Sequence, residues 1–162
     1  MKQISLRKAK LDDLDTFRKF HEDDDAQFLY SNHDETDEVN GNEVLKKVTD
    51  DIGGYNQSLF DNDPSKIFGE NLKNIYFINV NQVVCGYIRT EKKSKELAIR
   101  DMTISDYSIL NEVYLSKLFY CLFQKTKVEK IIIYFCNGNN AKMLQRIGFA
   151  QMIGRLEKTA GI

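Results

Sequence analysis

The spacing of apolar residues predicts the first elements of the chain. Residues 3–9 alternate between apolar and polar side chains, which is typical of a strand. In the segment that follows, apolar residues recur at three-residue steps, which predicts a helix with one buried face. These residues are Leu11, Leu14, Phe17 and Phe20. A second helix is expected at residues 43–52 and could extend toward residue 60, although Gly53 and Gly54 would interrupt it.

The middle of the chain has the clearest strand pattern. Residues 75–80 and 83–90 are rich in β-branched and aromatic side chains, and only Asn81 and Gln82 separate them. Two such runs around a two-residue turn predict an antiparallel hairpin. A charged turn follows, and residues 96–105 are expected to form the next strand.

The second half predicts alternating helices and strands. Residues 108–125 are apolar on most sides, which indicates a buried helix. Residues 130–135 are continuously apolar, as expected of a central strand covered on both faces. A short helix at residues 140–147 should end at Gly148, and residues 149–158 supply a last strand.

The predicted order is β-α-α-β-β-β-α-β-α-β, which indicates an α/β fold with a mixed sheet and helices on both faces. The helix between the strands at 96–105 and 130–135 makes those strands parallel, with a right-handed crossover. With 162 residues and no repeat, linker or low-complexity tract, we expect a single domain over residues 1–162.

Charge and composition exclude several classes of partner. The formal net charge of −1 produces no overall field that would favour nucleic acid or an anionic membrane. No apolar run has the length of a signal peptide or a membrane span, so we expect a cytoplasmic protein. The three cysteines lie in apolar segments without CxxC spacing, which favours reduced core thiols over a disulfide framework or a zinc site.

Three segments resemble the GNAT (GCN5-related N-acetyltransferase) superfamily, and with the element order the resemblance covers nearly the whole chain. "ISLRKAKLDDLDTF" is similar to the family's first strand and helix, and "VVCGYIR" to its third strand, with Gly86 at the glycine position. "NGNNAKMLQRIGF" resembles the signature N-x-x-A-x-x-x-Y-x-x-x-G-F. Aligned on Gly148, that signature places its Asn on Asn137, its Ala on Asn140 and its Tyr on Leu144.

The resemblance implies that acetyl-CoA is the co-substrate and that a primary amine is the acceptor. The cofactor would lie in a split between the strands ending at Ile104 and Phe135, with its diphosphate at the start of the next helix. Asp101 would be the catalytic base for the amine, and a tyrosine normally protonates the leaving thiolate. The implied cofactor contacts are Met102, Thr103, Ile104, Ser108, Asn111, Val113 and Asn137.

The chain departs from the family at three places. The diphosphate loop R/Q-x-x-G-x-G/A falls on residues 108–113, where none of its signature positions matches and Glu112 adds negative charge. Leu144 replaces the thiolate acid, and a shift of one residue would place Gln145 there. After the last predicted strand, little room remains for the family's seventh strand, so we expect a fold shortened at that strand.

These departures leave two functions open. The first is an N-acetyltransferase that uses a degenerate loop. The second is an inactive GNAT-fold binding or regulatory module, because the lost loop would supply charge-assisted hydrogen bonds of about 1.5–3 kcal/mol each. The chain would be a monomer or a homodimer. A homodimer built by strand exchange is a third possibility, since a missing last strand would leave a sheet edge to cover.

Acidic residues and histidines mark a further candidate site. Nine acidic residues and no Lys or Arg lie between Glu22 and Glu43, which suits either a cationic acceptor, as a small molecule or a peptide, or a solvated loop. His21 and His33 flank this stretch and are expected at the surface. A metal pair with Asp25 or Asp34 would match no strong ligand motif, so we expect no metal site.

The remaining candidates each have a structural alternative. Glu96 is a second possible base on the strand of Asp101, although both carboxylates could be structural or surface groups. Tyr107 and Tyr134 are spare acids or packing residues. Cys136 ends a strand of the split, but a nucleophilic role would require a paired histidine, and neither histidine is placed to provide one.

Overall fold

The computed structural model describes residues 1–30, 63–134 and 138–161. The helix predicted at residues 43–52 lies outside these ranges. The helices are α1 (Leu14–His21), α4 (Pro64–Asn71), α5 (Glu112–Thr126) and α6 (Gly138–Arg146). The strands are β1 (Ile4–Lys8), β2 (Gln27–Tyr30), β3 (Ile75–Val80), β4 (Val83–Lys93), β5 (Glu96–Ile104), β6 (Lys130–Ile133), β7 (Ala150–Met152) and β8 (Arg155–Thr159).

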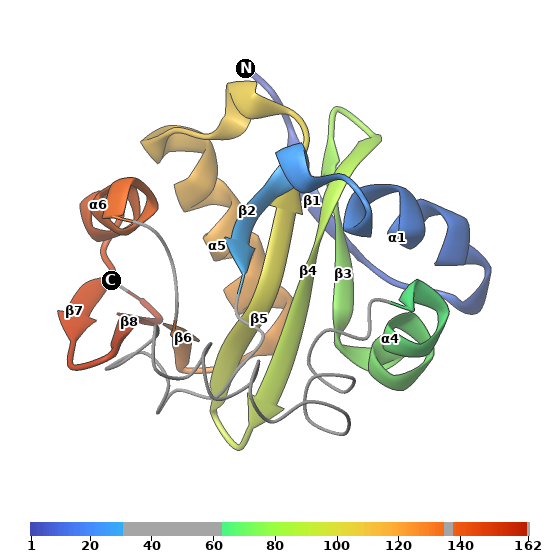
Figure 1. Ribbon diagram of the computed structural model, residues 1–162. Coiled ribbons are helices and arrows are strands. Elements are labelled where there is room, and N and C mark those ends of the chain that lie inside the picture. The colour runs from blue at the N-terminus through green and yellow to red at the C-terminus, as the bar shows by residue number, and fades with distance from the viewer. Residues whose placement is uncertain (31–62, 135–137, 162) are drawn as a thin grey trace, which may run out of the picture.

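The strands form one mixed sheet in the order β1-β3-β4-β5-β6-β8-β7, with β2 paired to β5 outside this path. All pairs are antiparallel except β5 with β6. The helices α1 and α4 pack on one face, whereas α5 and α6 pack on the other (Figure 1). The predicted α/β fold with a parallel β5–α5–β6 crossover is therefore confirmed.

Two hydrophobic clusters hold the helices to the sheet. The larger cluster joins α5 and α6 to one face, with Leu118, Phe119 and Leu144 fully buried among the strand residues. The smaller cluster joins α1 and α4 to the other face, around Phe17 and Phe77. The sheet therefore separates two cores, and the buried strand residues divide between them.

Several boundaries follow local chemistry that can be read from the chain. Asn81 and Gln82 both have positive φ (50° and 70°), as a two-residue hairpin turn between β3 and β4 requires. Gly148 also has positive φ and follows α6, where the amide of Phe149 donates to the carbonyl of Leu144. Both predicted turns are confirmed, and both fix where a strand or helix ends.

Other boundaries differ from prediction. The helix expected from residue 108 begins at Glu112, because the Asn111 side chain caps it by accepting from the amide of Tyr114 at 3.1 Å. Residues 107–109 form a separate 3-10 turn, η5 (Tyr107–Ile109). Leu11 was expected on the buried face of the first helix but is 78% exposed, because it lies in a 3-10 turn before α1.

Two elements were not predicted. Strand β2 is only four residues long and sits inside the acidic stretch, where its polar neighbours conceal it. Helix α4 begins at Pro64 after Asp63, whose side chain accepts from the amide of Ser65 at 3.0 Å. An aspartate cap followed by proline is a recognisable helix start, so the sequence did contain a signal for α4.

The C-terminal region contains two strands where one was predicted. A turn at residues 153–154, with Gly154 at positive φ, folds β7 back along β8, so that the hairpin extends the sheet beyond β6. The expectation that the last strand is missing is wrong. Because β7 covers the edge of β8, the argument for dimerisation by strand exchange no longer has a basis.

Gly86 is required by a close approach between β4 and β5. A Cβ atom at this position would lie 1.9 Å from the carbonyl oxygen of Thr103, which is far inside van der Waals contact. The obstacle is backbone, so it cannot move aside as a side chain would. We therefore expect Gly86→Ala to lower the free energy of unfolding by about 3 kcal/mol, measured by chemical denaturation.

Gly69→Ala is the matched control for this prediction. Gly69 lies within α4, and no atom lies within 4 Å of the Cβ it would gain. This substitution should raise stability by about 0.5–1 kcal/mol, because alanine loses less backbone entropy in a helix than glycine. Equal stabilities for Gly86→Ala and the parent protein would contradict the close approach.

Candidate functional site

The candidate site begins at a bulge in β5. Arg89 pairs with Asp101 and Thr90 pairs with Ile99, so Arg100 is one extra residue in β5. Parallel pairing with β6 also ends here, since its last pair joins Ile99 to Ile133. A bulge bends a strand and often lies beside an active site. Beyond Ile99, β5 therefore leaves β6 and presents an open edge.

Strand β2 occupies this open edge. Because β4 pairs along the whole of one edge of β5, β2 must take the other edge, which β6 holds in the lower half of the strand. Its residues pair antiparallel with Asp101, Met102 and Thr103. In Figure 1, β2 lies along the upper part of β5, on the side where α6 stands. The split expected to receive pantetheine is thus filled by the chain itself.

Two side chains hold the β2 segment from outside the sheet. Asn140 at the start of α6 donates through Nδ2 to the carbonyl of Phe28 at 2.7 Å. The Tyr107 hydroxyl in η5 donates to the carbonyl of Asp25, just before β2. Phe28 and Leu29 are also buried, at 7% and 2% exposure. The β2 segment is therefore held by β5, by η5 and by α6.

A connected group of polar side chains lies beside the bulge, on the face that carries α1. Asp101 is 3% exposed and accepts from Arg89 twice, at 2.9 Å from Nε and 3.3 Å from Nη2. The Tyr87 hydroxyl donates to Asp101 at 3.3 Å, and its oxygen lies 3.0 Å from Nδ1 of His21. A buried carboxylate is thereby linked through a phenol to an imidazole.

The geometry defines the tautomer of His21. A phenol has one proton, and Tyr87 gives it to Asp101, so Nδ1 of His21 must donate to the phenol oxygen. The lone pair of neutral His21 is then on Nε2, which bonds to no residue that the structure describes. The ring stacks on Phe17 at 5.2 Å between centroids. Burial lowers the pKa of His21 below its usual value, which favours the neutral base at pH 7.

In this arrangement, Asp101 and His21 share the role that was predicted for Asp101 alone. Both of its oxygens already accept hydrogen bonds from Arg89 and Tyr87, so it is placed to orient neighbouring groups. Neutral His21, by contrast, keeps on Nε2 a lone pair that no described residue uses. Sequence reasoning assigned His21 to the surface, because Tyr87 and Asp101 are remote from it along the chain and no short motif joins the three.

The start of α5 contains most of the residues expected to meet the diphosphate. The amide and hydroxyl of Ser108 both donate to Asp106, and Asn111 caps the helix, so neither side chain points to a ligand in this state. The amides of Glu112 and Val113 belong to the first turn and have no partner within the helix. They are the donors that a diphosphate could use.

The loop at residues 108–113 contains no Lys or Arg, but two cations from other parts of the fold lie beside it. Arg146 at the end of α6 lies 3.8 Å from Glu112, and Lys2 lies 3.5 Å from Asp106. Both pairs are exposed or half-exposed, so each contributes little to stability. They nevertheless place positive charge beside the start of α5. The sequence alone indicated an acidic loop, because Lys2 and Arg146 are distant from residues 108–113 along the chain.

The other predicted contacts have different surroundings. Met102 and Ile104 are fully buried in the larger core, so only their backbone could meet a cofactor. Thr103 is buried too, and its hydroxyl oxygen accepts from the amide of Tyr87 at 3.2 Å. Leu144 is a core residue without an acidic proton. Asn137, together with His33 and Cys136, lies outside the described residues.

The remaining candidates lie apart from the His21 group. A pocket of about 250 Å³ is lined by Glu96 and Tyr134, together with the bulge residue Arg100. Cys85 and Cys121 are free thiols as predicted, and burial raises the pKa of Cys85 to about 11, which makes it unreactive. Among residues 1–30, 63–134 and 138–161, no three His, Cys, Asp or Glu side chains gather as metal ligands would. In the same ranges, no helix is both long and apolar enough to cross a membrane.

Comparisons with known proteins identify the fold. No protein-family model matches the sequence, and no curated protein matches it. Solved structures do resemble it over almost its whole length. A GNAT-family acetyltransferase from Streptococcus agalactiae has a TM-score of 0.60 at 12% identity, covering 98% of this chain and 96% of that one.

Two further structures contain coenzyme A. PaiA N-acetyltransferase from Thermoplasma acidophilum has a TM-score of 0.53 at 12% identity, covering 97% of this chain and 99% of that one. The aminoglycoside acetyltransferase AAC(6')-Ib has a TM-score of 0.54 at 14% identity, with 98% and 95% covered. The chain therefore has the GNAT acetyltransferase fold, as its sequence suggested.

The half-buried position of His21 predicts its titration. We expect NMR to give a pKa for His21 below about 6.5, because burial disfavours the imidazolium. Asp101→Asn should lower this pKa further, since the charge of Asp101 raises it whereas the charge of Arg89, which would remain, lowers it. A His33→Gln variant assigns the signals of the two histidines. A pKa for His21 that Asp101→Asn leaves unchanged would contradict the linkage through Tyr87.

Proposed function

We propose that this protein is an N-acetyltransferase that moves an acetyl group from acetyl-CoA to a primary amine. The observation that carries the proposal is the bulge at Arg100, which separates β5 from β6 beside the His21 group. The GNAT fold supports it, because proteins of this fold hold coenzyme A in the structures described above. The fold alone does not define chemistry, which depends on the residues of the site.

Acetyl-CoA would extend along β5 from the bulge to the start of α5. The amides of its pantetheine arm would pair with the backbone of Met102 to Ile104, on the edge that β2 now holds. Its diphosphate would accept from the amides of Glu112 and Val113, with Arg146 offsetting part of the charge. The site therefore fits the molecule once β2 leaves the edge.

The chemistry requires one proton acceptor near the thioester. The amine nitrogen forms a bond to the acetyl carbon, the bond from that carbon to sulfur breaks, and Nε2 of His21 takes the proton of the amine. Tyr87 and Asp101 hold the imidazole in the necessary tautomer. The thiolate takes its proton from water, because Leu144 stands where a tyrosine would act.

The acceptor is proposed to be cationic. Glu22, Asp23, Asp24 and Asp25 follow His21 directly and are all exposed. Four consecutive carboxylates beside the base would attract an ammonium group and favour amines that carry a second positive charge. Small polyamines and lysine-containing peptides have this property.

A second function is favoured by the position of β2. If the free energy that holds β2 on β5 exceeds the binding free energy that acetyl-CoA gains on this edge, acetyl-CoA does not displace the strand. The chain is then an inactive GNAT-fold binding or regulatory module. A ligand that needs a minor state binds more weakly in proportion to the population of that state. The two functions therefore differ in a measurable quantity, the affinity for acetyl-CoA when β2 is loosened.

Loosening β2 should strengthen acetyl-CoA binding if the cofactor replaces this strand. Tyr107→Phe and Asn140→Ala each remove one hydrogen bond to a carbonyl of the β2 segment. At about 1 kcal/mol for each bond, the double variant should bind acetyl-CoA up to about thirtyfold more tightly. Isothermal titration calorimetry measures the affinities. Tyr120→Phe is the matched control, because Tyr120 is exposed on α5 and forms no hydrogen bond with the described residues of the β2 segment.

Three results of this titration decide between the functions. Tighter binding by the double variant, with Tyr120→Phe unchanged, supports the transferase with β2 in competition. No heat and no thermal shift with either protein at millimolar acetyl-CoA would favour the inactive module, because saturation at about 100 times the Kd stabilises a protein by about 2.7 kcal/mol. Equal affinity in all variants would contradict the overlap between β2 and the cofactor.

His21→Asn tests the proposed base. An asparagine amide can still donate to the phenol of Tyr87 as Nδ1 does, but it offers no basic nitrogen. We expect kcat/KM for acetyl transfer to a diamine to fall about a hundredfold at pH 7, with acetyl-CoA affinity unchanged. Release of the coenzyme A thiol gives the rate. An unchanged rate and pH profile would exclude His21 as the base.

A further inference from the structure

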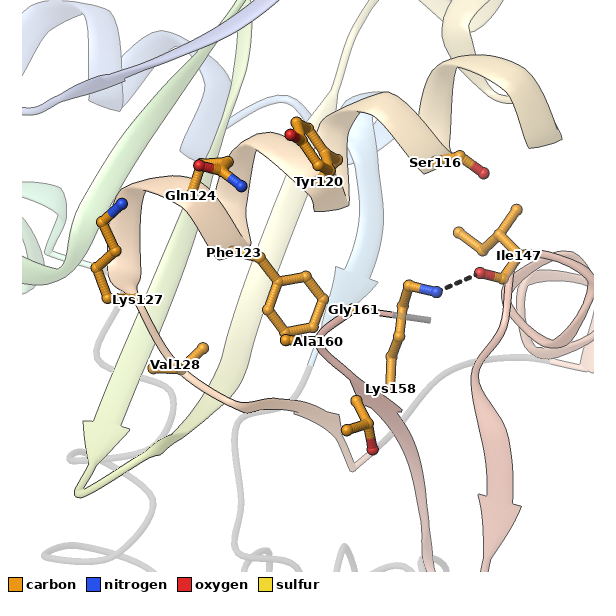
Figure 2. A pocket seen from close by; sticks show the side chains of 11 residues that line it. Ser116, Tyr120, Phe123, Gln124, Lys127, Val128, Ile147, Lys158, Ala160 and Gly161 are labelled. Carbon is orange, nitrogen blue, oxygen red and sulfur yellow. Dashed lines mark hydrogen bonds between the residues drawn. The ribbon is translucent and has the colours of Figure 1, made fainter.

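A cavity lies between α5, the end of α6 and the last strand, with a volume of about 640 Å³ (Figure 2). This volume is in the range of small-molecule pockets. The side chains of Tyr120 and Phe123 come from α5, and Lys158 comes from β8. None of the residues that the bulge and the His21 group use lines this cavity, so it is separate from the proposed transferase site.

One ammonium group in this cavity lacks a counter-ion. Nζ of Lys158 donates to the carbonyl of Ile147 at 2.7 Å, which uses one of its three N–H groups (Figure 2). Among the described residues, no carboxylate forms an ion pair with it. Lys158 is partly buried, and burial lowers its pKa because a less hydrated ammonium group is disfavoured.

The walls of the cavity contain no Asp or Glu. In Figure 2 the ring of Phe123 points down toward Ala160 and Gly161, so one wall is apolar. The aromatic side chain of Tyr120 is 64% exposed at the same place, although buried partners usually cover such rings. Among the described residues that line it, the cavity therefore combines positive charge with apolar surface and contains no carboxylate side chain.

We propose that this cavity binds a small organic carboxylate with an aromatic body. The carboxylate accepts from the two remaining N–H groups of Lys158, and the ring of the ligand packs against Phe123 and Tyr120. A carboxylate replaces the hydration that the ammonium has lost, while the apolar body covers the exposed aromatic wall. A monoanion matches a site whose central charge is a single ammonium. The proposal does not depend on transferase activity.

Phenylacetate is the probe for this site, and phenylacetamide is its neutral counterpart of nearly equal shape. We expect phenylacetate to bind saturably to the full chain, with NMR shifts centred on Tyr120, Phe123 and Lys158. Phenylacetamide should bind about tenfold more weakly or not at all, since it loses a charge-assisted hydrogen bond. Absence of saturable binding by phenylacetate, or equal binding of the two probes, would overturn the proposal.

Substitutions test the charge of Lys158 separately from its contribution to folding. Lys158→Met keeps the apolar stem and should weaken phenylacetate binding about tenfold, whereas Lys158→Arg should retain it. Lys125→Met is the matched control, because Lys125 is an exposed cation of α5 outside the cavity lining. If Lys158→Met is unstable, Tyr120→Ala gives a second test, because it removes an exposed wall and should also weaken binding. Equal affinity in Tyr120→Ala and the parent protein, or tighter binding of phenyl phosphate than of phenylacetate, would contradict the assigned ligand class.

Discussion

This structure depends on one constraint, which is that a single edge of β5 can form only a limited number of hydrogen bonds. A strand has two edges, and β4 takes the whole of one edge of β5, so everything else must share the other. The bulge at Arg100 divides that second edge, giving its lower part to β6 and its upper part to β2. Buried amides and carbonyls require partners, so a vacated upper edge would need another backbone, a ligand or water. The competition between β2 and acetyl-CoA follows from this requirement.

The sequence predicted most of the fold because its strands and helices agree with local patterning. The hairpin at Asn81 and Gln82, the buried helix α5 and the crossover to β6 all follow from periodicity and turn chemistry. The bulge could not be predicted in this way. It depends on a register shift between β4 and β5, and no feature of Arg100 in the chain marks it. Likewise, β2 is only four residues long and lies within an acidic stretch, so its pairing with β5 could not be predicted from the chain.

The candidate site was predicted only at its centre. Asp101 follows from its position in the resemblance, but its partners Arg89 and Tyr87 come from β4, and His21, which bonds to Tyr87, comes from α1. Tertiary packing alone brings these groups together. The same applies to Arg146 and Lys2, which place cations beside a loop that contains none. Charge counted along a chain therefore misjudged the field at a site assembled from distant elements. Packing also accounts for Leu144, whose complete burial explains why an apolar residue fits there.

The short connection from α1 to β2 has a mechanical consequence. Only five residues separate His21 from the first residue of β2, and a fully extended segment of that length spans roughly 17 Å. Three of these residues already form a compact turn. Any molecule that displaces β2 from β5 therefore pulls on the segment that ends at His21. Binding at the edge of β5 and the position of the imidazole are therefore mechanically coupled. A molecule that binds at this edge can also reposition the group that accepts the proton.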